Sequence, residues 1–279
     1  MMDAKRRSSW RQAVKEAIVQ KIEMFQEGLL PVTRQYPAPG WTLSGPCRAT
    51  FADPVGLPLW LCRAQVGPGV TLSVGRVHGD QALYVVSGTL RAGGQECSSG
   101  GAVILESGAG ATVEITSEAE LVHVGSGGNA AEPPQAAPLV HVVGARGWFH
   151  SGTREGVDAT WFADGTCPSC RIAFFSVARG AAPAKRGPMH SHSQPEIIHV
   201  LEGKVSLGAR DLGPGSSLCI RGDVRYTLTI DEGGARFLNY RPDKSEQTYF
   251  GPGAATRTEA EGGLARGGIQ VDDLVSVKG

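Results

Sequence analysis

The sequence predicts an all-β chain built from two small barrels in tandem. Glycine accounts for 39 of the 279 residues, and glycine reaches the positive φ angles of tight turns without strain. Short runs rich in Val, Leu, Ile and Tyr lie between these turns, as in strands joined by hairpins. Gly88 and Gly203 are 115 residues apart, as are Gly100 and Gly215. The equal spacing predicts two copies of one fold.

Composition and charge narrow the range of partners. Apolar residues make up 41% of the chain, and the 27 basic residues balance the 27 acidic ones. A net charge of zero gives no electrostatic basis for binding nucleic acid or a membrane surface. No apolar run approaches the roughly 20 residues that span a bilayer. We therefore expect no nucleic acid and no membrane, but a small-molecule substrate and a second copy of the chain, as a homodimer.

Residues 1–36 are expected to form an N-terminal helical arm. Apolar side chains recur at helical spacing from Ser8 to Gly28, a plausible C-cap; they are Trp10, Val14, Ala17, Ile18, Ile22 and Phe25. We interpret this helix as packing outside the first barrel. Met1 to Trp10 is charged and has no apolar core behind it, unlike a secretory signal. A cytoplasmic location, with the six cysteines reduced, is the expectation.

The rest of the chain divides at changes in composition. The first barrel is assigned to residues 37–130 and the second to 144–245. Between them is a linker, 131–143, which includes the Pro/Ala-rich stretch Glu132–Pro138. Residues 246–279 are Gly-rich and polar, and are expected to be a loosely held tail.

The candidate metal site lies in the second block. His190, His192 and Glu196 share even parity, so on an extended segment they project to one face, which in a small barrel can be the interior. Two imidazoles and a carboxylate on one face are a ligand set for mononuclear iron, manganese, nickel or zinc. His199 has the opposite parity and is expected to point outward.

These residues resemble the first motif of the cupin superfamily. That motif is a His-x-His pair, a Glu four or five positions later and a Gly seven positions beyond the Glu, matched here by His190, His192, Glu196 and Gly203. The resemblance covers roughly residues 40–243 and is strong only in the second block. It implies a bicupin whose first barrel is degenerate, and one divalent metal ion in the second.

The second motif of the family departs from its usual form. It runs from a Gly through a Pro-x-Gly turn to a fourth ligand, a His. Counting from Gly215 places Tyr226 at the His position, with Arg221 and Asp223 replacing the turn Pro and Gly. A slip of one residue would place Arg225 there. Tyr226 could ligate the metal as a phenolate or act as a general base, and Arg225 or Arg221 could pair with a substrate carboxylate.

In the first block the corresponding positions are Gly75, Val77, Gln81 and Ala111. Only Gln81 could contact a metal. We interpret this barrel as a structural partner, with an apolar binding pocket as the alternative. In the second barrel, the inward positions expected to line the pocket are Phe175, Ile198, Val200, Phe237 and Asn239.

The functional hypothesis is a metal-dependent enzyme acting on a small organic acid, diketone or phenolic compound. The family resemblance implies a dioxygenase with Fe2+ first among the metals, and with Mn2+, Ni2+ or Zn2+ as alternatives. A lyase or isomerase in which the metal polarises a carbonyl, and a small-molecule-binding cupin without catalysis, are the other hypotheses. Tyr226 and Arg225 are the expected catalytic residues.

Overall fold

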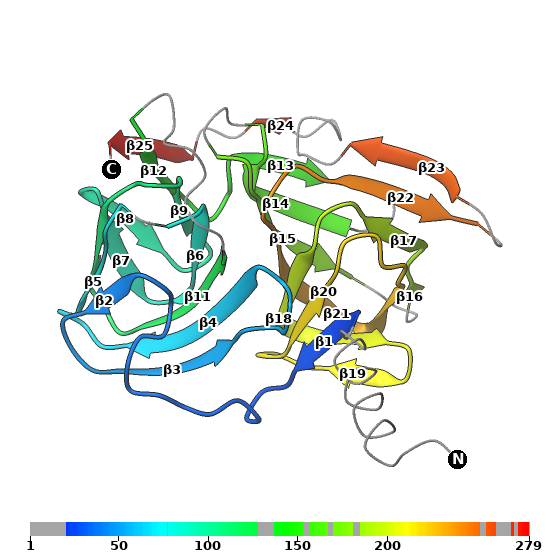
Figure 1. The fold of residues 1–279 in the computed structure, drawn as a ribbon, viewed down its shortest axis with the longest axis horizontal. Coiled ribbons are helices and arrows are strands. Elements are labelled where there is room, and N and C mark those ends of the chain that lie inside the picture. The colour runs from blue at the N-terminus through cyan, green and yellow to red at the C-terminus, as the bar shows by residue number, and fades with distance from the viewer. Residues whose placement is uncertain are drawn as a thin grey trace, which may run out of the picture.

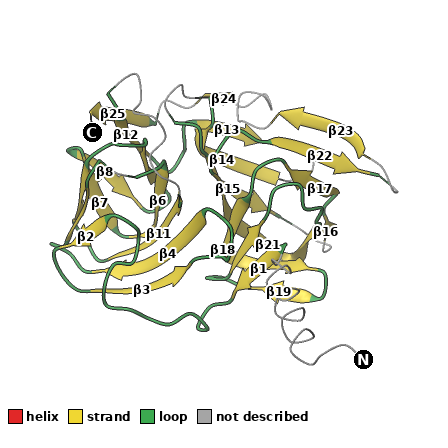
Figure 2. Cartoon of the chain, in the orientation of Figure 1, coloured by secondary structure: helices red, strands yellow, loops and turns green. Residues whose placement is uncertain are grey.

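The protein folds into two β-barrels that lie side by side (Figure 1). The computed structural model describes residues 21–76, 78–127, 137–152, 157–166, 170–180, 185–251, 255–260, 269–270 and 273–278. Within these ranges all regular secondary structure is β-strand (Figure 2). The described residues contain no helix with the length and apolar character to cross a membrane. The predicted all-β class is confirmed.

The first barrel is formed by two facing sheets. One sheet has the strand order β25 (Leu274–Lys278), β12 (Leu139–Val143), β9 (Ala102–Leu105), β6 (Gln81–Ser87), β11 (Ala119–Ser126), β4 (Leu59–Val66) and β3 (Cys47–Ala52). The other has the order β2 (Trp41–Leu43), β5 (Thr71–Val74), β10 (Ala111–Ile115), β7 (Thr89–Ala92) and β8 (Gln95–Ser98).

The second barrel repeats this plan with longer strands. Its main sheet runs β1 (Ile22–Phe25), β20 (Ser217–Ile220), β18 (Glu196–Leu207), β21 (Leu228–Arg241), β15 (Ala173–Arg179), β14 (Val157–Asp164), β13 (Phe149–Gly152) and β24 (Ile269–Gln270). Strands β16 (Lys185–Arg186) and β19 (Arg210–Leu212) pair with β21 and β18. A smaller sheet contains β17 (Met189–His192), β22 (Glu246–Phe250) and β23 (Ala255–Ala260).

The two barrels exchange their outermost strands. Strand β1, near the N-terminus, pairs with β20 of the second barrel, with Ile22 opposite Ile220. Strand β25, near the C-terminus, pairs with β12, which in turn pairs with β9 of the first barrel. In Figure 1 the blue β1 therefore lies on one barrel and the red β25 on the other. Strand β1 therefore extends a sheet of the second barrel, and strand β25 extends a sheet of the first.

The repeated glycines have the same structural cause in both barrels. Gly88 and Gly203 have φ angles of 84° and 70°. A Cβ atom at either would lie 2.1 Å from a backbone carbonyl oxygen, that of Glu118 or Gly234. Gly100 and Gly215 also have positive φ, 87° and 82°. The 115-residue spacing therefore marks equivalent turns, as the sequence predicted.

Alternating side chains divide the core into three layers. One apolar cluster fills the first barrel and a second fills the other barrel. A third lies between them and includes Tyr84, Phe162, Phe174 and Tyr240. Because successive residues of a strand point to opposite faces, Ile198 of β18 faces the second barrel's interior while Ile197 faces the layer between barrels.

Three segments differ from their expected structure: the N-terminal arm, the tail and the linker, whose residues 139–143 form strand β12 and pair with β9 of the first barrel. Residues 22–25 form strand β1 rather than the end of a helix, and β1 lies on the second barrel; residues 8–20 lie outside the described residues. Ile22 and Met24 pack against the second barrel's core and Phe25 against the layer between barrels, so tertiary packing overrides the helical spacing. The expected tail contains β22, β23, β24 and β25, and β22 pairs with β17.

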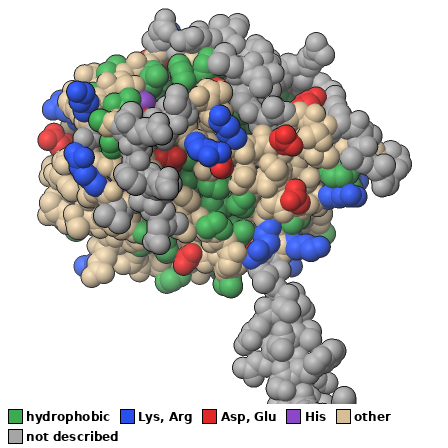
Figure 3. Space-filling view, turned by 45° about the horizontal axis from the view of Figure 1, so that its top comes forward, with side chains coloured by type: hydrophobic (Ala, Val, Ile, Leu, Met, Phe, Trp, Pro, Cys, Tyr) green, Lys and Arg blue, Asp and Glu red, His purple; other side chains and the backbone are tan. Residues whose placement is uncertain are grey.

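The surface carries charges of both signs. On the face drawn in Figure 3, basic and acidic side chains are interspersed rather than gathered by sign. Charged side chains also pair across neighbouring strands, such as Arg236 with Glu202 and Lys204 with Asp231.

Candidate metal centre

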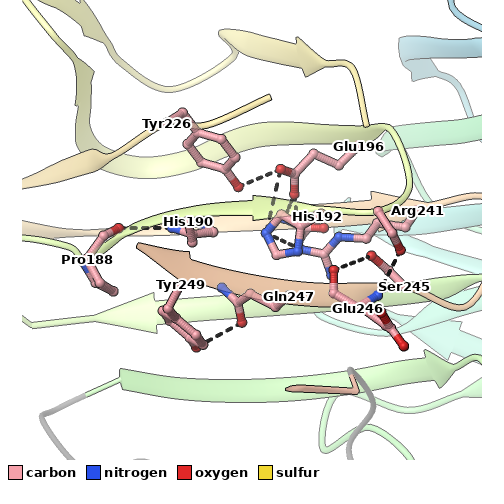
Figure 4. A network of polar contacts seen from close by, with 12 residues as sticks. Pro188, His190, His192, Glu196, Tyr226, Arg241, Ser245, Glu246, Gln247 and Tyr249 are labelled. Atoms are coloured by element: carbon pink, nitrogen blue, oxygen red, sulfur yellow. Dashed lines mark hydrogen bonds and ion pairs between the residues drawn. The ribbon is translucent and has the colours of Figure 1, made fainter. Parts of the chain in front are cut away.

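Two strands carry the three candidate ligands. His190 and His192 lie on β17, and Glu196 is the first residue of β18. His192 and Glu196 are buried, whereas His190 is partly exposed. The two imidazole ring centres are 5.0 Å apart, and His192 Nε2 is 3.7 Å from Glu196 Oε1. The structure therefore places the three side chains on one wall of the second barrel's interior (Figure 4).

The Glu196 carboxylate accepts hydrogen bonds on both oxygens. The Tyr226 hydroxyl donates to Oε1 at 2.5 Å. The Asn239 side-chain amide donates to Oε2 at 2.8 Å, and the Arg241 guanidinium donates to the same oxygen at 3.0 Å. A buried carboxylate is tolerated only when it is hydrogen-bonded and its charge is paired, and these donors meet that requirement.

Arg241 is the residue that the sequence reasoning missed. Its Nη2 donates to Glu196 Oε2 and also to His192 Nε2, at 3.1 Å, so one buried cation contacts two of the three candidate ligands. The signal was present in the sequence: Phe237, Asn239 and Arg241 alternate on one strand, and the first two had been assigned to the interior. A charged residue two positions farther on has the same parity.

The hydrogen bonds fix where the imidazole protons lie. An arginine can only donate, so His192 Nε2 accepts and carries no proton. His190 Nδ1 donates to the carbonyl oxygen of Pro188 at 2.9 Å, because a carbonyl oxygen can only accept. Burial, ahead of the neighbouring charges, lowers the pKa of His190 and so favours its neutral form. Both rings therefore have an unprotonated Nε2, the atom that a metal ligand needs.

Electrostatics keep Glu196 ionised. Burial opposes the charge, but the Arg241 guanidinium and the hydrogen bonds from Tyr226 and Asn239 favour it, and the pKa of Glu196 lies below its usual value. In other sites such a strongly compensated carboxylate serves either a structural ion pair or a ligand position.

The turn before Tyr226 settles the register of the second motif. Asp223 has a φ of 61°, so it takes the left-handed conformation expected of the glycine that it replaces. Tyr226 follows with its side chain inward and buried. Its ring centre lies 4.4 Å from that of His190. Tyr226, and not Arg225, occupies the position of the fourth ligand.

Arg225 and Arg221, the two arginines predicted to bind a substrate carboxylate, contact residues other than the candidate ligands. Arg225 is exposed, and its guanidinium stacks 3.9 Å above the ring of Phe250; alternation along the chain turns it away from the side on which Tyr226 lies. It can reach a substrate only at the outer rim of the barrel. Arg221 donates to the carbonyl oxygen of Gly56 at 2.8 Å, which ties the turn to a loop of the first barrel.

The other inward positions are where the parity placed them. Phe175, Ile198, Val200 and Phe237 belong to the apolar cluster of the second barrel. His199 points out of that barrel and is buried against Ser217, whose hydroxyl lies 2.8 Å from its Nδ1. Strand β22 adds Gln247 opposite His192, a buried side chain from the segment expected to be a tail.

Similar folds are found only among solved structures. No protein-family model matches the chain, and no curated protein matches its sequence. A variant of Bacillus subtilis oxalate decarboxylase aligns at 14% identity over 79% of this chain and 77% of its own, with a TM-score of 0.56. A predicted glyoxylate-induced protein of Pseudomonas aeruginosa reaches 16% identity over 79% and 88%, with a TM-score of 0.62.

A third similar structure is a predicted dioxygenase of Nostoc punctiforme, at 11% identity over 93% of this chain and 88% of its own, with a TM-score of 0.59. All three have two cupin barrels in tandem, as this chain does. The chain has a bicupin fold. At these identities the likeness concerns the fold, so the chemistry is argued from the residues.

In the described part of the first barrel, Gln81 takes the position that Glu196 has in the second. Gln81 stands 115 residues before Glu196, and its Oε1 accepts from Trp41 Nε1 at 2.7 Å and lies 2.9 Å from His123 Nε2. His123, opposite Leu83 on the next strand, corresponds to Asn239, opposite Ile198. Val77 lies outside the described residues. A neutral, buried cluster thus fills the position that carries charges in the second barrel.

The donor types of the second barrel suit a divalent metal ion, but their contacts involve Arg241. Two unprotonated imidazole nitrogens and an ionised carboxylate are a recognised metal ligand set. Among the residues that the structure describes, however, no three His, Cys, Asp or Glu side chains are gathered closely enough to hold a metal ion. The donor chemistry of the site fits the ion, and Arg241 contacts two of the three donors.

Proposed function

We propose that this bicupin is a metal-dependent enzyme in which His190, His192 and Glu196 hold one divalent ion. The observation that carries the proposal is the convergence of two unprotonated Nε2 atoms and an ionised carboxylate on the inward wall of one barrel. The other barrel offers a neutral cluster at the same position, so only one metal ion per chain is expected.

The substrate class proposed is a small organic acid, diketone or phenolic compound. The walls beside the candidate ligands are apolar and aromatic, with Phe175 and Phe237 among them, which suits a small molecule with a polar reacting end. Tyr226 would hold or move a proton at its hydroxyl, because that hydroxyl donates to Glu196 and its ring lies beside the His190 ring.

The reaction proposed first is oxidation by O2, with Fe2+ as the ion. When bound, the metal would supply open coordination positions for substrate and oxygen. A protein of similar fold is described as a predicted dioxygenase, which supports this choice by analogy. The test is O2 uptake by the Fe2+-loaded protein with a panel of catechols, diketones and hydroxy acids; consumption of O2 in step with a substrate is expected.

A lyase or isomerase reaction is the second candidate. The short hydrogen bond between Tyr226 and Glu196 gives the site a proton donor and acceptor that need no oxidant. Similar structures include oxalate decarboxylase, for which Mn(II) centres are described. Turnover of the same panel without O2 uptake, in protein loaded with Mn2+, Ni2+ or Zn2+, would favour this reaction. Ligand binding with no turnover under any metal would support a non-catalytic cupin.

A further inference from the structure

Arg241 is a buried cation at the centre of the candidate metal site. It is the last residue of β21, and because Ile197 pairs with Tyr240, it lies opposite Glu196. Its Nη2 contacts Glu196 Oε2 and His192 Nε2 at 3.0 and 3.1 Å, and its guanidinium carbon lies 5.4 Å from the centre of the Phe175 ring. Figure 4 shows the guanidinium beside the His192 imidazole and the Glu196 carboxylate.

This position conflicts with a metal ion on the same two atoms. A guanidinium stays protonated at any pH at which proteins are folded, so its charge cannot be lost to relieve repulsion. A divalent ion bound to His192 Nε2 and Glu196 Oε2 would lie only a few Å from that charge, where like charges repel strongly even at an effective dielectric constant of about 20. Arg241 and the ion therefore compete for these two atoms.

The fold itself does not require an arginine here. In the first barrel the residue opposite Gln81, the counterpart of Glu196, is Gly125. A Cβ atom at Gly125 would meet the Trp60 ring at 2.4 Å, so an uncharged indole occupies that space. In the second barrel the residue opposite Arg241 is Ala173, which leaves room for the long side chain. The neutral Trp60 ring therefore occupies in the first barrel the space that the charged Arg241 side chain occupies in the second.

We propose that Arg241 is the resident cation of the site and sets its metal affinity: a divalent ion binds by displacing the guanidinium from His192 and Glu196. This inference rests on the proposed function, because it assumes that these residues are the ligands. Arg241 thereby acts as a positioning residue, which holds the Glu196 carboxylate and the His192 imidazole in place and resists any ion too weakly bound to displace it.

The experiment measures Mn2+ binding by the full-length chain. Protein stripped with a chelator is titrated with Mn2+ while the electron paramagnetic resonance signal of the free aquo ion is recorded. Arg241→Met removes the charge and keeps the side-chain volume, and should bind Mn2+ at least about tenfold more tightly. Arg241→Lys keeps the charge and should bind like the wild type. Arg236→Met, the same change at a partly exposed position of β21 away from the candidate ligands, is the matched control and should also leave the affinity unchanged.

The outcomes separate this inference from the proposed function. One Mn2+ bound by both the wild type and Arg241→Met with equal affinity would overturn the inference and leave the proposed function standing. An equal gain in Arg241→Lys and Arg241→Met would overturn it too, because charge would not be the cause. No binding by any variant would remove the proposed function, and the inference with it. If Arg241→Met fails to fold, as judged by its thermal unfolding, Arg241→Gln replaces it with the same expectation.

Discussion

Replacing Glu196 with glutamine should destabilise the protein strongly, because the buried Arg241 then loses its anionic partner. The substitution keeps the shape of the side chain and removes its charge, so Arg241 is left without the anion opposite it. Arg241 and Glu196 are 2% and 1% exposed, which makes theirs a buried ion pair. Removing one partner of such a pair costs about 3–5 kcal/mol, because the remaining buried charge loses the counter-ion that faces it.

The two partners should not be equivalent. At the 3.0 Å separation and an effective dielectric constant of about 20, the attraction is about 5 kcal/mol. An arginine cannot release its proton, so Glu196→Gln should lose most of the 3–5 kcal/mol. In Arg241→Met the carboxylate can take up a proton instead, and the loss should be smaller. The double variant, which has neither charge, should be more stable than the sum of the two single losses implies.

Urea unfolding followed by circular dichroism measures these free energies. Glu202→Gln is the matched control, since Glu202 pairs with Arg236 across the same two strands with side chains 63% and 40% exposed, and exposed pairs contribute about 1 kcal/mol or less. Additive losses in the double variant, or a loss for Glu196→Gln no larger than for Glu202→Gln, would refute the reasoning.

Three further changes test other features. Tyr226→Phe should lower turnover about 100-fold with metal content retained, by metal analysis and steady-state rates; equal loss of both would mean that the phenol is a ligand. Gly203→Ala should cost more than the roughly 1 kcal/mol of Gly208→Ala in urea unfolding, because its Cβ would lie 2.1 Å from the carbonyl oxygen of Gly234 whereas that at Gly208 meets open space. Burial lowers the pKa of His199 to about 3. Its unfolded value is about 6.5, so stability is lost as the pH falls between these values, about 2 kcal/mol from pH 7 to pH 5. His199→Asn should flatten this dependence, and an unchanged slope would contradict it.

Most of the correct predictions came from the 115-residue repeat of turn glycines and from the alternation of side chains along strands. Gly88 and Gly203 had to recur because each lies against a carbonyl oxygen, so their spacing reported two equivalent turns. Period-two alternation placed His192 and Glu196 on the inward face and His199 on the outward one, since the direction of a strand side chain is a local property. Tyr226 was likewise found by counting from a turn glycine.

What could not be predicted depends on partners distant in the chain. Residues 22–25 read as helical by spacing, but β20, nearly 200 residues later, provides the edge with which they pair. Strand β22 lacks a strong strand pattern and is ordered by pairing with β17. The contact of Arg241 with His192 likewise joins residues on strands whose adjacency is a property of the whole barrel.

The exchange of end strands makes the two halves of this molecule mechanically interdependent. A cut in the linker would not release two self-sufficient domains, because each fragment would retain a strand that belongs to the other's sheet. Trimming β25 should open an edge in the first barrel, and trimming β1 should expose β20, the neighbour of the strand that carries Glu196. Loss of residues 22–25 would therefore change the sheet one strand away from the candidate metal centre.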